Sequence, residues 1–248
     1  VADGGKSSKA MYGHLLPAVL RLSVDGEAVT HNLFEPLLTQ LITWFTDPGN
    51  VSQGGAEPML DAVADALCDP SNSPLRDAAA QKLAAFLKWA IKQHSARSKD
   101  GATKLHVNSL FGRLFHLAVH PDPYKIIGAS LALKQIKQEI LGSPNLCEKY
   151  LFQFMQHFLT SLKLSDKDDE ALEAAAMAKM SIKYLTRIFK HNQRADLDWE
   201  AHPTSGLRAC VQRTFEGTAA SERAYRDACT ELFVLLATFV DSRSGGGR

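Results

Sequence analysis

The chain lacks any apolar run long enough to cross a membrane. Its uncharged apolar stretch from Leu232 to Val240 is far shorter than the roughly 20 residues that a transmembrane helix needs. It also lacks an excess of charge of either sign, because its 28 basic and 27 acidic residues leave a net charge of +1 over 248 residues. We therefore expect a soluble protein with no membrane partner, in which any contact with nucleic acid is local.

Cysteine is scarce and widely spaced. Cys68, Cys147, Cys210 and Cys229 form neither a CxxC pair nor the spacing of a disulfide framework. Each lies in or beside a predicted helix, so we expect reduced, mostly buried thiols of an intracellular protein. The chain has no initiator methionine and no signal-like start, and it ends in the Gly-rich stretch Ser242–Arg248. We interpret both ends as cuts in a longer polypeptide.

Alternating strand patterns are also missing, whereas apolar residues recur at helical spacing throughout the chain. The clearest example is the hairpin predicted over residues 106–141, whose two helices are separated by His120–Pro123. Its second helix is apolar on two sides and therefore needs two neighbours. The residues that we expect in the core of this hairpin are Leu110, Leu114, Leu131, Leu133 and Ile136.

About ten helical runs fall into five such hairpins, at intervals close to the roughly 40–47 residues of HEAT and armadillo repeats. The predicted fold class is all-α, an α-solenoid of about five HEAT/armadillo-like helical hairpins in a single helical-repeat segment, residues 1–248. A compact helical bundle is the alternative. The predicted hairpins span about residues 8–46, 57–94, 106–141, 146–191 and 204–240.

Two helix starts carry capping signals. Ser73 stands before Pro74, and proline suits the first helical position because its missing backbone donor costs nothing there. Ser165, with Asp168 three residues later, has the capping-box pattern. We therefore predict that Ser73 and Ser165 are the N-caps of the second helices of hairpins two and four.

No catalytic motif is complete. His116 and His120 have the i, i+4 spacing of a zinc-binding helix, but Leu117 stands where the general-base glutamate belongs and no third ligand is evident. Ser130 lies in a sequence similar to a nucleophile elbow, but inside a predicted helix. We therefore expect no catalysis, no metal and no cofactor in this segment.

One charge pattern is a candidate binding site. Its members recur every three or four residues, which places them on one face of a helix. A solvated outer face explains such a stripe, and so does a surface that meets phosphate or an acidic partner. The residues of the predicted stripe are Lys179, Lys183, Arg187, Lys190 and Arg194.

Several stretches of the sequence carry a family resemblance. They include Lys6–Pro17, Leu33–Leu37, Phe86–Trp89, Ser109–Phe111 and Gly128–Ala132. In these stretches the chain resembles the HEAT-repeat region of the DNA-dependent protein kinase catalytic subunits, which are members of the phosphatidylinositol-3-kinase-like kinase family. The resemblance covers the chain from residue 6 to about residue 140, and only fragments beyond it.

The resemblance implies a scaffold segment, with an ATP-binding serine/threonine protein kinase domain elsewhere in the parent chain. It implies a nuclear parent of the DNA damage response that acts in double-strand break repair by non-homologous end joining. The implied partners are neighbouring helical repeats of the same chain and, through the parent, the Ku heterodimer and DNA ends. From the fold alone, the alternative is a free-standing helical-repeat adaptor or transport receptor that binds a peptide on its concave face.

The resemblance also bears on two loops. Ser52 precedes Gln53 in the glycine-rich loop Gly49–Gly55, and a kinase that modifies serine before glutamine would make Ser52 a phosphosite. A basic loop is expected in relatives after the fourth hairpin. Here the loop Gln193–Glu200 contains Arg194 but also several acidic residues, which weakens a prediction of DNA contact.

Overall fold

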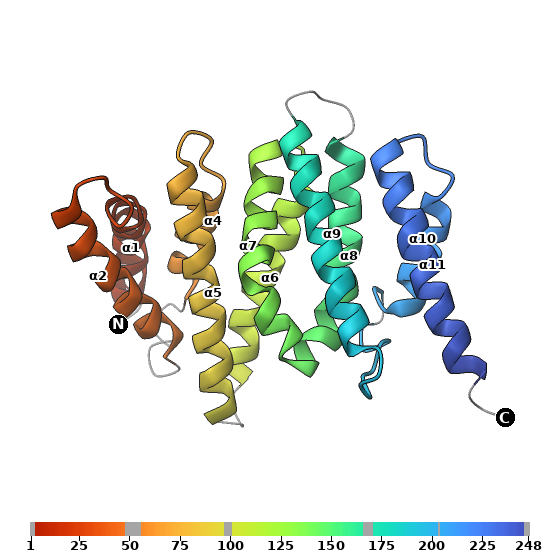
Figure 1. Ribbon diagram of the computed structural model, residues 1–248. Coiled ribbons are helices and arrows are strands. Elements are labelled where there is room, and N and C mark those ends of the chain that lie inside the picture. The colour runs from red at the N-terminus through yellow and green to blue at the C-terminus, as the bar shows by residue number, and fades with distance from the viewer. Residues whose placement is uncertain (1–2, 48–55, 97–100, 166–170, 203, 246–248) are drawn as a thin grey trace. The chain divides into compact units, whose positions relative to one another are not determined.

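A computed structural model describes residues 3–47, 56–96, 101–165, 171–202 and 204–245 (Figure 1). Within these ranges the secondary structure consists of helices and turns, without a strand, as predicted. None of the described helices has the length and apolarity needed to span a bilayer. The chain divides into two compact units, Val1–His116 and Leu117–Arg248.

The first unit consists of stacked helical hairpins. Consecutive helices pack together, α1 on α2 and α4 on α5. Equivalent helices of successive hairpins also pack on one another, α1 on α4 and α2 on α5. The helices of this unit are α1 (Asp3–Leu22), α2 (Ala28–Thr46), α4 (Glu57–Leu67), α5 (Ser73–Ala96) and most of α6 (Gly101–Ala118).

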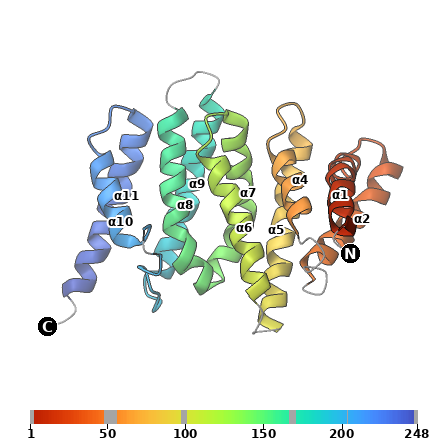
Figure 2. The ribbon, with the colours of Figure 1, turned by 180° about the vertical axis from the view of Figure 1, so that it is seen from behind.

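The second unit repeats this arrangement with α7 (Pro123–Leu141), α8 (Pro144–Ser165), α9 (Leu172–Asn192), α10 (Leu207–Gly217) and α11 (Arg223–Gly245). Helices α8 and α9 pair, as do α10 and α11. Helices α7, α9 and α11 follow one another in one layer, and α8 and α10 lie in the other (Figures 1 and 2). Two layers of stacked hairpins are the arrangement of an α-solenoid, so the predicted fold class is confirmed.

The break inside the predicted hairpin 106–141 is also confirmed. Helix α6 ends at Ala118 and α7 begins at Pro123. The Asp122 carboxylate caps α7 by accepting a 2.9 Å hydrogen bond from the backbone N–H of Tyr124. The backbone N–H of Asp122 donates to Nδ1 of His120 at 3.0 Å. Proline at the first helical position and an aspartate N-cap together explain why the second helix starts here.

The expected core of this region is confirmed at four of its five positions. Leu110, Leu114, Leu133 and Ile136 are each at most 1% exposed. The prediction for Leu131 was wrong, because this side chain is only half-buried. Leu131 is two residues from Leu133, which turns it by about 200° around the helix and away from the buried face.

Both predicted N-caps were wrong. The side chain of Asn72 accepts the backbone N–H of Leu75 at 3.0 Å, so Asn72 is the cap and Ser73 is the first helical residue. Asparagine and serine cap helices about equally well, and local sequence does not choose between neighbours. Ser165 is the last residue of α8, while α9 begins at Leu172. The predicted partner Asp168 lies outside the described residues.

Polar contacts link neighbouring hairpins within the first unit. The guanidinium of Arg113 in α6 forms ion pairs with Glu57 and Asp61 in α4, and its Nε lies 3.0 Å from an Asp61 oxygen. Arg21 in α1 pairs with Asp69 at 3.1 Å. These pairs join elements that are about 50 residues apart in sequence, so they favour the register in which the hairpins stack.

Candidate functional site

The predicted basic stripe lies on the exposed side of α9. This helix buries Leu185 and Phe189 on its opposite side, and Ile182 on its flank, with at most 5% exposure each. Four members of the stripe, which we call the α9 basic row, are exposed and helical: Lys179, Lys183, Arg187 and Lys190. Arg194 is exposed as well, but it lies beyond the end of the helix at Asn192. Within the described ranges, no ion pair involves these five side chains.

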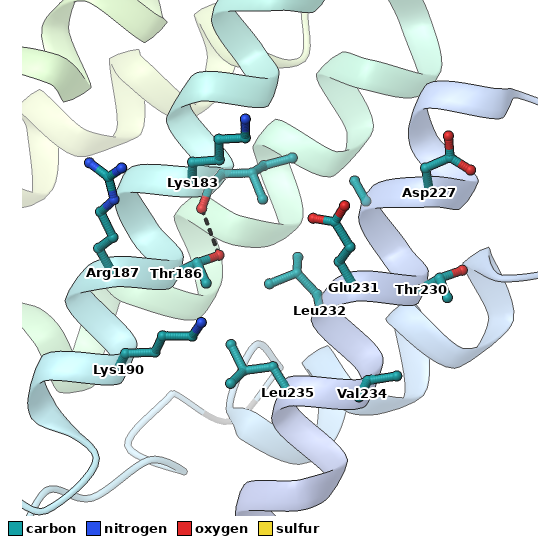
Figure 3. A pocket seen from close by; sticks show the side chains of 12 residues that line it. Lys183, Thr186, Arg187, Lys190, Asp227, Thr230, Glu231, Leu232, Val234 and Leu235 are labelled. Atoms are coloured by element: carbon teal, nitrogen blue, oxygen red, sulfur yellow. Dashed lines mark hydrogen bonds between the residues drawn. The ribbon is translucent and has the colours of Figure 1, made fainter.

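A groove of about 790 Å³ runs between α9 and α11, and we call it the α9–α11 groove (Figure 3). Lys183, Arg187 and Lys190 line its α9 side. Its floor is apolar, because Ile182, Ala228 and Leu232 line it while remaining at most 7% exposed. The volume lies within the roughly 300–1,000 Å³ typical of ligand sites.

The opposite side of the groove carries acidic residues of α11. Glu231 lines the groove from α11, and Lys190 extends toward α11 from the α9 side (Figure 3). Asp227 lies on the outer rim, where its Oδ2 is 3.8 Å from Nε of Arg223. Arg187 points to the far side of α9 (Figure 3). The groove therefore has one basic side, one acidic side and an apolar floor.

A second, smaller groove of about 280 Å³ lies between α7 and α9. The ammonium group of Lys137 lies 4.3 Å from the centroid of the Tyr184 ring, in a cation–π contact. Arg187 lines this groove as well as the larger one. The α9 basic row is therefore a ridge between two grooves.

The residues of the incomplete catalytic motifs have structural roles. Nδ1 of His120 accepts the backbone N–H of Asp122 at the helix join, and its Nε2 lies 3.1 Å from Nζ of Lys125. Ser130 is 1% exposed inside α7. Among the described residues, no three histidine, cysteine, aspartate or glutamate side chains cluster so as to hold a metal ion. Ser52 and its loop lie outside the described residues, so the phosphosite stays a prediction.

The loop before α10 is anchored by a tryptophan that sequence reasoning missed. Trp199 is 3% exposed, and its ring centroid lies 5.3 Å from that of Phe189, 5.7 Å from Phe152 and 6.1 Å from Phe239. These partners belong to α9, α8 and α11. Two large apolar residues, Leu197 and Trp199, in an otherwise polar loop were the available signal.

The acidic residues of this loop are also structural. Oε1 of Glu200 accepts the backbone N–H of Arg208 at 3.0 Å, which satisfies a free donor at the start of α10. The backbone N–H of Asp198 donates to Glu148 of α8 at 3.0 Å. A Cβ on Gly206 would lie 2.3 Å from a Glu200 carboxylate oxygen, so a larger residue here would displace that carboxylate from the start of α10. The loop positions α10 and α11 and thereby the acidic side of the α9–α11 groove.

Burial changes the ionisation of two thiols and one histidine of the second unit. All four cysteines are free and three are buried, as predicted. Burial raises the pKa of Cys147 and of Cys210 to about 12. Burial lowers the pKa of His157, whose Nδ1 lies 2.7 Å from the carbonyl oxygen of Gln153. These groups are therefore neutral at pH 7.

Stacked two-layer hairpins define a helical-repeat protein of the HEAT/armadillo class. Comparison with known proteins identifies the family. The family described as DNA-dependent protein kinase catalytic subunit, CC1/2, matches residues 6–204. The chain is 36% identical over 185 residues to the DNA-dependent protein kinase catalytic subunit of Gallus gallus, and 34% identical over 180 residues to that of Mus musculus. The chain therefore belongs to the DNA-dependent protein kinase catalytic subunit family.

The matches cover most of this chain and little of the relatives. They span 75% and 73% of the chain for the two relatives above, and 64% for a 32% identical relative from Dictyostelium discoideum. In each case the chain spans about 4% of the relative's length. The predicted resemblance is confirmed, and the match extends past residue 140. Helices α10 and α11 lie beyond the family match at residue 204.

Proposed function

We propose that this chain is a non-catalytic helical-repeat scaffold segment of a DNA-dependent protein kinase catalytic subunit. The parent acts in double-strand break repair by non-homologous end joining, in the nucleus, with its kinase domain elsewhere in the chain. Its Ku and DNA-end contacts are made through the parent as a whole. The family match and the small share of the relatives that the chain covers support this proposal.

One observation carries the scaffold function: α2 is apolar on two opposite faces. Its buried face packs inside the first unit through Leu38, Ile42 and Phe45. The opposite face exposes Val29 by 74% and Leu33 by 64%, and Leu37 and Trp44 continue the same stripe at 38% each. These four residues stand at i, i+4, i+8 and i+15, which places them on a single helical face. A two-sided apolar helix is built to lie between two neighbours.

A second exposed apolar face lies on the α10–α11 hairpin. Phe215 is 60% exposed, and its ring centroid lies 5.4 Å from that of Phe233. Val234 on α11 is also 60% exposed, where it lines the α9–α11 groove. An exposed phenylalanine next to a half-buried one suits packing against another hairpin. Both faces support a chain whose partners are neighbouring repeats of the same parent.

The test compares Leu33→Glu in two settings. In the 248-residue chain the side chain is exposed, so we expect the free energy of unfolding to change by less than about 0.5 kcal/mol. In the full-length kinase subunit a covered Leu33 would place the new carboxylate inside an apolar interface. There we expect a lower thermal unfolding midpoint and weaker DNA-stimulated phosphorylation, because an unpaired buried charge is costly.

Met180→Glu on α9 is the control, because Met180 is also exposed, by 41%, and lies outside the apolar stripe of α2. It should leave both proteins nearly unchanged. If Leu33→Glu changed neither the unfolding midpoint nor the phosphorylation of the full-length subunit, this face would be exposed in the parent. The proposed packing role of α2 would then be wrong. A lower thermal unfolding midpoint of the full-length Leu33→Glu subunit, with unchanged DNA-stimulated phosphorylation, would confirm that the face is packed. It would also show that this packing is not linked to activation by DNA ends.

A further inference from the structure

The α9–α11 groove differs from an ordinary solvated surface in the way it combines charge and apolarity. Lys183 and Lys190 stand on its α9 side without an ion-pair partner among the described residues. Glu231 stands on the α11 side, and it too has no ion pair among the residues that the structure describes. The apolar floor between them includes Leu232. Unpaired charges of opposite sign therefore face each other across an apolar strip.

We propose that this groove binds a short amphipathic α-helix of a partner protein. One flank of that helix carries carboxylates that face Lys183 and Lys190, and the other carries a lysine or arginine that faces Glu231. Its apolar stripe lies on the groove floor. This goes beyond the scaffold function, because the groove is built entirely within this chain's second unit.

Charge spacing supports a helical occupant. Lys183 and Lys190 are seven residues apart, or about two turns and 10 Å along the α9 axis. A partner helix repeats the same spacing at i and i+7, so it aligns two carboxylates with these two ammonium groups. Its apolar residues then fall at i, i+3 and i+4 positions between the charged flanks. Helix-in-groove recognition uses this combination of apolar anchors and flanking charges.

The acidic side of the groove disfavours nucleic acid as the occupant. A phosphate backbone laid along the α9 basic row would bring its charges close to Glu231 and Asp227 on α11. Phosphate binding draws its affinity from uniformly basic surfaces, and carboxylates opposite the strand oppose it. An apolar floor also offers nothing to a hydrated sugar–phosphate chain. The mixed charge pattern instead complements a protein segment that carries both signs.

The probe is a designed, fluorescein-labelled helical peptide of three heptads. It has leucine at positions a and d, glutamate at e, lysine at g, and alanine or glutamine elsewhere. Binding to the 248-residue chain is measured by fluorescence anisotropy at low salt. We expect saturable binding that weakens at least about 10-fold in the double variant Lys183→Glu/Lys190→Glu, because two attractive pairs become repulsive.

Two variants sharpen the test. Lys134→Glu is the matched control, because Lys134 is exposed on α7 and lines neither groove. It should change the affinity less than about 2-fold. Adding Glu231→Lys to the double variant exchanges the charges of the two sides. A helix laid in the opposite direction presents its flanks in exchanged order, so the exchanged groove should recover most of the lost affinity.

Three results would overturn the proposal. The first is equal binding of a peptide whose leucines are replaced by glutamine, which would show that the apolar floor is not used. The second is tighter binding of a peptide with glutamate on both flanks, which would mean that the site attracts any anion. The third is displacement of the peptide by a 20-base-pair DNA duplex whose own binding is lost in Lys183→Glu/Lys190→Glu, which would make the α9 basic row a nucleic-acid surface.

Discussion

Trp199→Ala tests whether the loop before α10 holds the second unit together. The indole is 3% exposed and contacts three aromatic rings, those of Phe152, Phe189 and Phe239. Truncation removes all three ring contacts and leaves a cavity at the junction of α8, α9 and α11. Buried Trp-to-Ala changes cost about 3–5 kcal/mol, and we expect a loss of unfolding free energy in that range.

The control variant is Trp199→Phe, which keeps a ring at the same position. The indole N–H of Trp199 is buried and has no hydrogen-bond partner among the described residues. Replacing the indole by a phenyl ring removes this unsatisfied donor, whose burial costs about 1–3 kcal/mol. That gain offsets part of the lost volume, so we expect Trp199→Phe to cost less than about 2 kcal/mol. The two variants therefore separate ring packing from the polar atom.

The assay is urea unfolding of the 248-residue chain followed by circular dichroism at 222 nm, with amide hydrogen exchange to locate the effect. Trp199→Ala should lower the protection of α10 and α11 in the second unit and leave α4 and α5 in the first unit unchanged. A loss below about 1 kcal/mol for Trp199→Ala would refute the reasoning. It would mean that the loop is dispensable and that α10 and α11 are held by their own contacts alone.

Three further predictions concern single sites. Gly217→Ala should lower the free energy of unfolding, measured in urea, by about 1–3 kcal/mol, because the new Cβ would lie 2.3 Å from the Cys229 sulfur. Gly112→Ala is the control, because a Cβ there meets open space, and it should be neutral or stabilising by up to about 1 kcal/mol. Native-state titration with a disulfide reagent should modify Cys68 first, because the other three thiols are buried, and rapid reaction of all four would contradict this burial. His157 should make stability fall in acid: its folded pKa is lowered by burial, so the unfolded chain binds the proton better. The contribution of neutral His157 to the free energy of unfolding is complete above the ordinary pKa of 6.5 and is lost as pH falls through the lower folded pKa. In urea unfolding series between pH 7.5 and 5, His157→Gln should therefore show a weaker dependence of stability on pH.

Much of the fold follows from local signals. The apolar period of the α6 and α7 segments and the prolines at 121 and 123 predict two helices and the break between them, and both are observed. Capping was harder to predict, because Asn72 and Ser73 are both good N-caps and only the backbone geometry selects Asn72. The predicted burial of Leu131 was wrong for a similar reason. An apolar residue at the edge of a helical stripe is buried only if a neighbour covers that edge.

The sequence predicted the basic side of the candidate site but not its acidic side. The spacing of Lys183, Arg187 and Lys190 shows that they share one face of a helix, and the structure exposes all three. Glu231 is some forty residues later in the chain, and no local pattern connects it with that face. Trp199 likewise has no periodic context, so its burial among aromatic rings from three helices was not predicted.

Helix period, prolines and charge spacing therefore settled which residues are helical and which of them lie together on one face. Those properties depend on neighbours within a few residues, because one helical turn is 3.6 residues long. Tertiary structure decided what each face meets: an acidic side across an apolar floor for the α9 basic row, and an aromatic cluster for Trp199. Packing between hairpins joins residues about 40 to 50 positions apart, and local periodicity carries no information about which distant face will be the partner.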